Sequence, residues 1–323
     1  MSKRLLIVDA LNMYYRAYIV DPSLSTNGEP IGGLKGFLKI LQKLTREIKP
    51  DAVVIAWDGP GGSQRRKLVN KNYKEGRKPI RLNRDIKNLT ENEELQNKIW
   101  QQTRLIEYLN CMPVIQCMFP GIEADDVISF VAQTPAFAGW QKVIVSSDKD
   151  FYQLCDDQTV VYRPIQQEAL NAPRIVEKHG IHPTNFALAR AVAGDKSDNL
   201  SGVPGVGLPT IAKRFQFLCE NKPYTIDDLF DACKAVENPL KAHKNILENR
   251  KTIERNYKLM QLYVPSISVQ TKREIKNIIS KFKFELDKTN IHVMMIEDGF
   301  GAYNWDDLFT TCKRIIDKNK EGI

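Results

Sequence analysis

Acidic side chains that could bind divalent cations recur along this chain of 323 residues. Some follow short apolar runs and others lie in three acid-rich stretches, 121–126, 146–150 and 194–199. Taken singly, such acids are also typical of helix N-caps, solvated loops and Asx turns. As a group they form a candidate metal site. The candidates are Asp9, Asp58, Glu123, Asp125, Asp126, Asp148, Asp150, Asp195 and Asp198.

The elements around these acids predict an α/β fold. Leu5–Val8, Ala52–Trp57 and Val143–Val145 are apolar runs bounded by polar residues, as in buried parallel strands. Helical apolar spacing in 33–48, 99–109 and 126–133 predicts helices that flank a parallel twisted sheet. Because ligands bind at the carboxyl ends of parallel strands, the acids that follow these runs are expected at one edge of the sheet.

A metal site follows from this gathering of acids. Carboxylates at one edge repel each other unless cations neutralise them. An oxygen donor set without histidine or cysteine favours Mg²⁺, with Mn²⁺ as a substitute. The acids outnumber the ligands that one ion needs, so we expect two ions about 4 Å apart, an arrangement suited to in-line displacement at a phosphodiester.

A cationic segment, Gln64–Lys87, lies between the acids at 58 and 123. It holds ten basic and two acidic residues, and its net charge of +8 equals that of the whole chain. Such a patch is typical of nucleic-acid binding. The alternative is a solvated loop. Such a loop can still bind nucleic acid, because a disordered segment can become ordered when it binds its partner. A helical ladder of basic side chains is expected in it, and the DNA contacts are expected from Arg65, Arg66, Lys67 and Lys71.

Three residues of the cationic segment are candidates for the reaction itself. Tyr73 can stack on a base. Lys74 and Arg77 are three residues apart, so they would share a helical face. We expect both to contact the scissile phosphate, because the transition state there needs fixed cationic donors.

A glycine-rich turn precedes a predicted helix in the second half of the chain, where the pattern is mostly helical (183–193, 208–218, 227–236 and 243–262). Glycines allow close approach of a ligand, and a helix N-terminus attracts phosphate. A tight connection between two helices is the alternative. The functional interpretation is a sequence-independent grip on a duplex backbone. Its residues are Gly202, Val203, Gly205, Val206 and Gly207, with Lys213 and Arg214 adding phosphate contacts.

Composition is that of an ordinary globular protein. The six cysteines show no zinc-like spacing and are expected as buried thiols in a reducing compartment. No stretch reaches the roughly 20 apolar residues of a membrane helix. We therefore expect a cytoplasmic protein with no membrane partner, and a monomer is the default expectation.

Together these motifs resemble the 5′-nuclease superfamily, which includes phage 5′-3′ exonucleases, flap endonucleases and the 5′-nuclease domain of bacterial DNA polymerase I. The resemblance covers about residues 4–260. It implies a PIN-like nuclease domain at 1–181 with a helical arch at about 60–105, a helix-three-turn-helix duplex-binding region at 182–262, and a C-terminal extension of unknown role at 263–323.

The resemblance also implies roles for the site residues. Acids matching 9, 58, 123 and 125 would mainly hold one metal ion, with Asp126 close by. Those matching 148, 150, 195 and 198 would mainly hold the second. The residues at 73, 74 and 77 would belong to the arch or its base. The turn at 202–207 would bind K⁺ through backbone carbonyls.

The expected function is therefore that of a standalone, phage-type 5′-3′ exonuclease or flap endonuclease that removes flaps and RNA primers during replication. Its partners would be DNA with a 5′ flap, a nick or a free 5′ end, and RNA–DNA hybrids. A single-stranded-DNA-binding protein or a clamp could bind the C-terminal extension. The alternatives are a non-catalytic nucleic-acid-binding module on the same fold, a PIN-type ribonuclease and a small-molecule phosphohydrolase.

Overall fold

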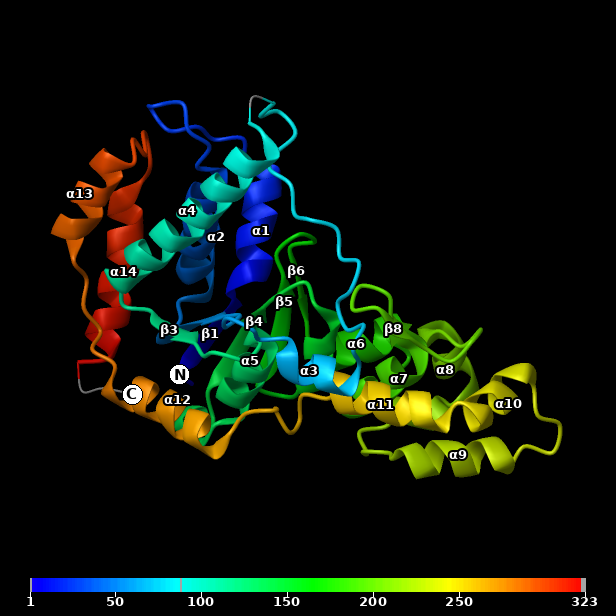
Figure 1. Ribbon diagram of the computed structural model, residues 1–323. Helices are drawn as coiled ribbons and strands as arrows, with labels where there is room; N and C mark the ends of the chain where they lie inside the picture. Colours follow the sequence, from blue (N-terminus) through cyan, green and yellow to red (C-terminus); the bar gives the residue numbers. More distant parts are fainter. Residues whose placement is uncertain (1, 88, 321–323) are drawn as a thin grey trace.

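A six-stranded sheet forms the centre of the computed structural model, which describes residues 2–87 and 89–320 (Figure 1). The strand order is β3-β2-β1-β4-β5-β6, and only the β5–β6 pair is antiparallel. The predicted parallel sheet is confirmed. The strands are β1 (Arg4–Asp9), β2 (Ala52–Trp57), β3 (Ile115–Met118), β4 (Gln141–Val145), β5 (Thr159–Arg163) and β6 (Glu168–Leu170).

The central strand β1 lies between β2 and β4, and its residues 5–8 are fully buried. Burial on both faces explains why β1 is a continuous apolar run with no polar alternation. In the register, Asp9 pairs with Ala56 and Val8 with Val145. The carboxyl ends of the three strands therefore lie side by side, as predicted.

Helices cover both faces of the sheet. In Figure 1, α1 (Ala10–Val20), α2 (Gly32–Ile48) and α4 (Glu91–Asn110) lie above it, and α5 (Ala124–Gln133) and α12 (Val269–Lys281) lie below it. A 3₁₀ helix, η1 (Pro135–Phe137), follows α5, and another, η2 (Lys149–Leu154), follows β4.

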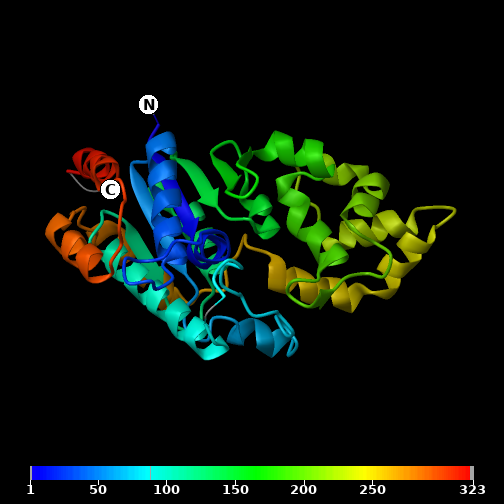
Figure 2. The same ribbon diagram turned by 90° about the horizontal axis from the view of Figure 1, so that it is seen from above.

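A helical lobe extends from one side of the sheet (Figure 2). Two predicted helices are shorter than expected: 243–262 divides at Asn249, and 208–218 ends at Arg214 before a 3₁₀ helix, η3 (Gln216–Cys219). The lobe holds α6 (Ala172–His179), α7 (Pro183–Ala193), the hairpin β7 (Gly194–Asp195) and β8 (Leu200–Ser201), α8 (Leu208–Arg214), α9 (Ile226–Lys234), α10 (Lys241–Glu248) and α11 (Arg250–Met260).

The C-terminal region returns to the opposite side of the sheet, where α13 (Lys288–Glu297) and α14 (Trp305–Lys318) lie near α2 and α4 (Figure 2). The buried Asp298 accepts hydrogen bonds from Arg104 Nε at 2.8 Å and Tyr108 Oη at 2.9 Å. Residues 263–320 are thus packed on the sheet-bearing part of the molecule. The last three residues of the predicted extension, together with residues 1 and 88 of the other predicted regions, lie outside the described residues.

The cysteine side chains are free thiols, and all except Cys219 are buried. No helix in the described ranges has the length and apolarity needed to cross a membrane.

Replacing Asp298 with alanine should lower the free energy of unfolding by about 2 kcal/mol, because it leaves the buried Tyr108 hydroxyl without its acceptor and removes one of three carboxylate partners of the half-buried Arg104. Urea unfolding measures the change. As a control, Asp231→Ala removes an ion pair to Lys234 in which both side chains are exposed, so it should cost less than about 0.5 kcal/mol. Equal effects of the two substitutions would contradict the assignment.

Candidate active site

Three acids lie where neighbouring strands end: Asp9 is the last residue of β1, Asp58 follows β2 and Asp148 follows β4. Each also caps a helical element. Asp9 caps α1, Asp58 Oδ1 accepts from Ala124 N at 2.7 Å at the start of α5, and Asp148 Oδ1 accepts from Asp150 N at 2.8 Å in η2. These three side chains therefore cap helical elements and also lie at the same edge of the sheet.

Gly59 brings the end of β2 against the start of α5. A Cβ at this position would lie 1.7 Å from the carbonyl oxygen of Phe119, so no other residue fits. The Gly59 N–H donates to the carbonyl of Ile122 at 3.0 Å. This close approach places Asp58 beside the three acids at 123, 125 and 126, which we call the first acidic group.

The acids at the strand ends share one electrostatic field. Loss of hydration, and then the charge of Asp125, raises the pKa of Asp9 to about 7. Loss of hydration also raises the pKa of Asp125 to about 6, although Arg66 and Lys74 partly oppose the rise. The pKa of Asp148 lies well above its usual value because of lost hydration and the nearby Asp150 and Asp125. The carboxylates are therefore close enough to repel each other.

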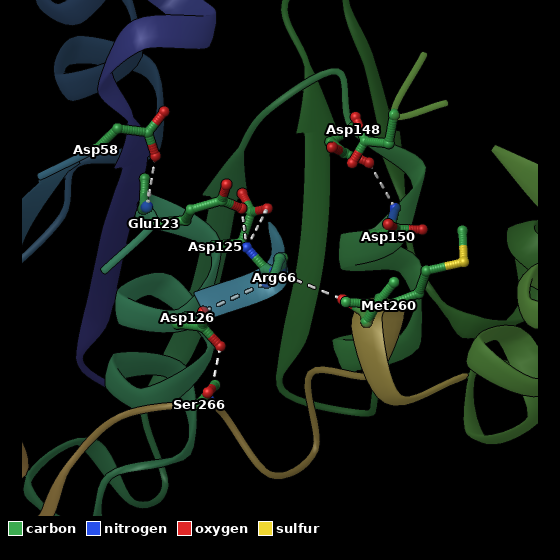
Figure 3. Close-up of polar contacts among 12 residues, drawn as sticks. Asp58, Arg66, Glu123, Asp125, Asp126, Asp148, Asp150, Met260 and Ser266 are labelled. Carbon is green, nitrogen blue, oxygen red and sulfur yellow. Dashed lines mark hydrogen bonds and ion pairs between the residues drawn. The ribbon is translucent and has the colours of Figure 1, made fainter. Parts of the chain in front are cut away.

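Arg66 is buried among the first acidic group rather than exposed, with 8% of its surface accessible (Figure 3). Its Nη1 pairs with Glu123 and lies 3.9 Å from Asp125 Oδ2. Its Nη2 lies 3.3 Å from Asp126 Oδ2, and its Nε donates to the carbonyl of Leu259 at 3.2 Å. The structure thus places this predicted DNA contact inside the protein.

Asp126 points away from the strand-end acids (Figure 3). Its Oδ1 accepts the backbone N–H of Ser266 at 2.8 Å, and its Oδ2 pairs with Arg66. Both carboxylate oxygens of this buried residue are therefore engaged by the protein.

The base of the cationic segment rests on the acids. Lys74 Nζ lies 2.8 Å from Glu123 Oε1, Tyr73 Oη donates to Asp198 Oδ2 at 2.9 Å, and Arg77 pairs with Asp198. The side chains of these three residues therefore contact Glu123 and Asp198, two acids that the sequence analysis predicted to bind metal.

The predicted helical ladder in this segment is wrong. Helix α3 (Gln64–Val69) ends before Lys71, and Lys74 has a left-handed φ of 59° in a turn. The Lys74 N–H donates to the carbonyl of Asp198 at 2.9 Å, so contacts with the 194–201 hairpin decide the backbone path here. Lys74 and Arg77 consequently do not share a helical face.

A second buried arginine, Arg190 of α7, pairs with two members of the second acidic group, which we define as the acids at 150, 195 and 198. Its Nε pairs with Asp150 Oδ1 at 2.8 Å and its Nη2 pairs with Asp195. Sequence reasoning missed this residue. A single arginine within Ala187-Leu-Ala-Arg-Ala-Val192 was the available signal, because a charge inside an apolar helix needs a partner.

Other predicted nucleic-acid contacts lie at the surface. Arg65, Lys67 and Lys71 are exposed on and after α3, and Lys213 and Arg214 are exposed in the last turn of α8. In the glycine-rich turn, a Cβ on Gly202 would lie 2.1 Å from the carbonyl oxygen of Ala193, and Gly205 has a φ of 73°. The turn also caps α8 through Gly207, while the residues at 203 and 206 are buried.

Within the described ranges, no three acidic, histidine or cysteine side chains are already arranged to hold a metal ion. The two buried arginines pair with acids on either side of the strand ends, whereas Asp9, Asp58 and Asp148 have no ion-pair partner among the described residues. Chemically, the arrangement offers hard oxygen donors to cations and cationic donors to a phosphate.

The chain is similar to proteins of known activity. It is 28% identical over 307 residues to a 5′-3′ exonuclease of Aquifex aeolicus, and the match covers 91% of this chain and 95% of that protein. A 5′-3′ exonuclease of Buchnera aphidicola is 32% identical over 212 residues, or 65% of this chain and 68% of that protein. Thermostable DNA polymerase I of Thermus aquaticus is 33% identical over 211 residues, but the match spans only 23% of the polymerase.

The fold is shared with a flap endonuclease of bacteriophage T5 that was solved as a pseudo-enzyme–product complex with DNA and metal ions. The TM-score is 0.63 at 17% sequence identity, and the match covers 98% of this chain and 99% of that chain. Residues 4–180 match the family model of the 5′-3′ exonuclease N-terminal, resolvase-like domain. On this match, which spans more than half of its length, the chain belongs to the 5′-3′ exonuclease family.

Proposed function

We propose that this chain is a metal-dependent 5′ nuclease, a 5′-3′ exonuclease and flap endonuclease. It hydrolyses phosphodiesters at the 5′ ends of DNA and of RNA–DNA hybrids, in flap and primer removal during replication. One observation carries this proposal: three neighbouring strands end in acids, and the base of the cationic segment is paired to two further acids of the same site, Glu123 and Asp198.

The residues fit divalent ions. The donor set is made of carboxylate oxygens, which suit Mg²⁺ or Mn²⁺. Burial, and to a lesser extent neighbouring acids, raises the pKa values of Asp9 and Asp125, so a bound cation would favour their charged forms. When bound, two such ions supply a nucleophile from water and stabilise charge on the phosphate oxygens. We assign Asp9, Asp58, Glu123 and Asp125 to one ion, and Asp148, Asp150, Asp195 and Asp198 to the other.

The cationic residues at the base of the segment then act on the substrate. Lys74 and Arg77 exchange their carboxylate partners for the scissile phosphate, where fixed cations stabilise the transition state. Tyr73, predicted to stack on a base, is instead 2% exposed, so its ring is not available to a base and its hydroxyl holds Asp198. The exposed Lys67 and Lys71 hold the strand outside the site through its backbone.

The helical lobe holds the duplex. Gly202–Gly207 and the N-terminus of α8 approach the backbone of one strand, and Lys213 and Arg214 contact its phosphates. A K⁺ ion bound by carbonyls of this turn would strengthen that contact. The Pro204 carbonyl accepts from Asn245 Nδ2 at 2.8 Å, so it is held in a fixed orientation.

Incubation with a 5′-labelled flap, a nicked duplex and an RNA–DNA primer hybrid, with and without Mg²⁺, tests the proposal. We expect cleavage near the 5′ end of each substrate only when Mg²⁺ is present. Binding without cleavage would indicate a non-catalytic module, and cleavage of single-stranded RNA alone would indicate a ribonuclease.

Asp148→Asn should lower the cleavage rate at least about 100-fold, because the neutral amide removes a charge at the centre of the site. The Kd for flap DNA, measured in Ca²⁺, should change less than about threefold. Asp306→Asn, at an exposed position of α14, is the matched control and should cleave normally. Normal cleavage by the Asp148 variant would refute the site assignment.

Lys74→Ala should lower kcat by about 100-fold or more, the loss seen when one fixed electrostatic donor is removed. Lys78→Ala removes the same charge from the same segment, but at an exposed position without an ion pair in the described part of the chain. It should weaken DNA binding modestly and leave kcat within about threefold. Single-turnover rates at saturating DNA compare the two variants, and equal rates would contradict the role of Lys74.

The stability of the metal-free protein should fall as the pH rises. The pKa of Asp9 is about 7 in the folded chain and 3.8 when unperturbed, so folding favours its protonated form. Its stabilising contribution is complete below about pH 4 and is lost as the pH approaches 7, a change on the order of a few kcal/mol.

Thermal unfolding in EDTA should therefore show a lower Tm at pH 8 than at pH 5.5, and the difference should shrink in Asp9→Asn. Adding Mg²⁺ at pH 8 should raise the Tm again. A Tm that does not depend on pH would contradict the crowding of buried carboxylates at the strand ends.

A further inference from the structure

Four residues, Arg65, Arg66, Asp126 and Ser266, form a closed ring of polar contacts, and three of these residues are labelled in Figure 3 (Arg66, Asp126 and Ser266). Arg66 Nη2 pairs with Asp126 Oδ2 at 3.3 Å, and Asp126 Oδ1 accepts from Ser266 N at 2.8 Å. The Ser266 carbonyl accepts from Arg65 Nη1 at 2.7 Å. Because the two arginines are consecutive on α3, the ring closes on itself. It joins the cationic segment, the acid-bearing helix α5 and the connection between α11 and α12.

The connection that supplies Ser266 is itself firmly anchored. Leu262 N donates to Gln153 Oε1 at 2.6 Å, and its carbonyl accepts from Gln133 Nε2 at 3.0 Å and from Ser129. Gln153 Nε2 also donates to the Met260 carbonyl at 3.0 Å. The backbone N–H of Ser266 is therefore a donor fixed in place by α5 and η2.

The ring leads directly to the residues proposed for catalysis. Arg66 contacts Glu123, and Glu123 accepts from Lys74 at 2.8 Å and from Tyr73 at 3.3 Å. Glu123 is 2% exposed, so its carboxylate needs these donors. A shift of Arg66 would therefore move the base of the cationic segment as well as the first acidic group.

We propose that Arg66 and Asp126 are a positioning pair of this nuclease, held by the Ser266 N–H. Asp126 orients the Arg66 guanidinium, and Arg66 positions the Glu123 carboxylate. That carboxylate in turn positions Lys74 and Tyr73. Asp126 is then not a metal ligand, and Arg66 is not a phosphate contact. This inference rests on the proposed function, and it gives both residues roles that differ from the expectation drawn from their types.

The geometry distinguishes these roles. A metal ligand needs a carboxylate that faces the strand-end acids, whereas the Asp126 carboxylate points away from them, toward the Ser266 N–H and Arg66 (Figure 3). A phosphate contact needs solvent access, whereas Arg66 is 8% exposed and its three nitrogens all have protein partners. The exposed neighbour Lys67 has that access and provides a matched comparison.

The test uses Arg66→Gln, Asp126→Asn, the double variant, and the controls Asp125→Asn and Lys67→Gln. Metal affinity is read from the rise of Tm with Mg²⁺ concentration. The Mg²⁺ midpoint is the Mg²⁺ concentration that gives half of this rise. Relative to the wild type, we expect it to stay within about twofold in Asp126→Asn and to rise at least about tenfold in Asp125→Asn. In EDTA, the double variant should lose less Tm than the sum of the two single losses, because the partners act as a pair.

DNA affinity is measured for the flap substrate in EDTA over a range of salt concentrations. Lys67→Gln should reduce the slope of log Kd against log salt by about 0.9, as expected for one lost phosphate contact. Arg66→Gln should leave this slope unchanged while lowering the single-turnover cleavage rate at least tenfold. If Arg66→Gln does not fold, Arg66→Lys, which retains the charge, is compared in the same assays.

Three results would overturn the inference. A Mg²⁺ midpoint shifted equally by Asp126→Asn and Asp125→Asn would make Asp126 a metal ligand. A salt slope reduced equally by Arg66→Gln and Lys67→Gln would make Arg66 a phosphate contact. Additive Tm losses in EDTA would show that the two residues do not act as a pair. Failure of the wild-type protein to cleave would instead refute the proposed function, and the EDTA measurement would still decide on the pair.

Discussion

The gathering of carboxylates at the carboxyl edge of the sheet is the constraint on which the rest of the structure depends. Like charges held together away from water are unstable unless cations compensate them. The protein supplies part of that compensation with two buried arginines, Arg66 for the first acidic group and Arg190 for the second. Each arginine comes from outside the sheet. The charge of the site thus draws the cationic segment and the helical lobe onto the same edge.

The same constraint explains why the base of the cationic segment has a defined path without regular helix. Tyr73, Lys74 and Arg77 bind acids from two groups that are far apart in the sequence. These contacts outweigh the local preference for a helix and hold Lys74 in a left-handed conformation that costs on the order of 1 kcal/mol. Strain of this kind persists only where surrounding contacts determine the conformation. The cations that compensate the acids are also the ones that a phosphate would recruit.

Sequence patterns predicted the part of the fold that depends on local rules. Strand-end acids at 9, 58 and 148 follow from apolar runs in parallel strands, and the turn at 202–207 follows from its glycines. The ladder from 66 to 74 failed because ion pairs to distant residues decide the backbone there. Arg190 was overlooked because an arginine on a helix is usually a surface residue, and only its apolar neighbours signal burial.

The contribution of the C-terminal region could not be predicted from residue types at all. Ser266 acts through its backbone N–H, a group that every residue except proline carries, so no side-chain pattern marks it. What matters is the path of 259–267, which other backbone and glutamine contacts fix against α5 and η2. The same path puts the Leu259 carbonyl, at the end of the helical lobe, on Arg66. A displacement of that lobe relative to the sheet would therefore reach the first acidic group through a single guanidinium.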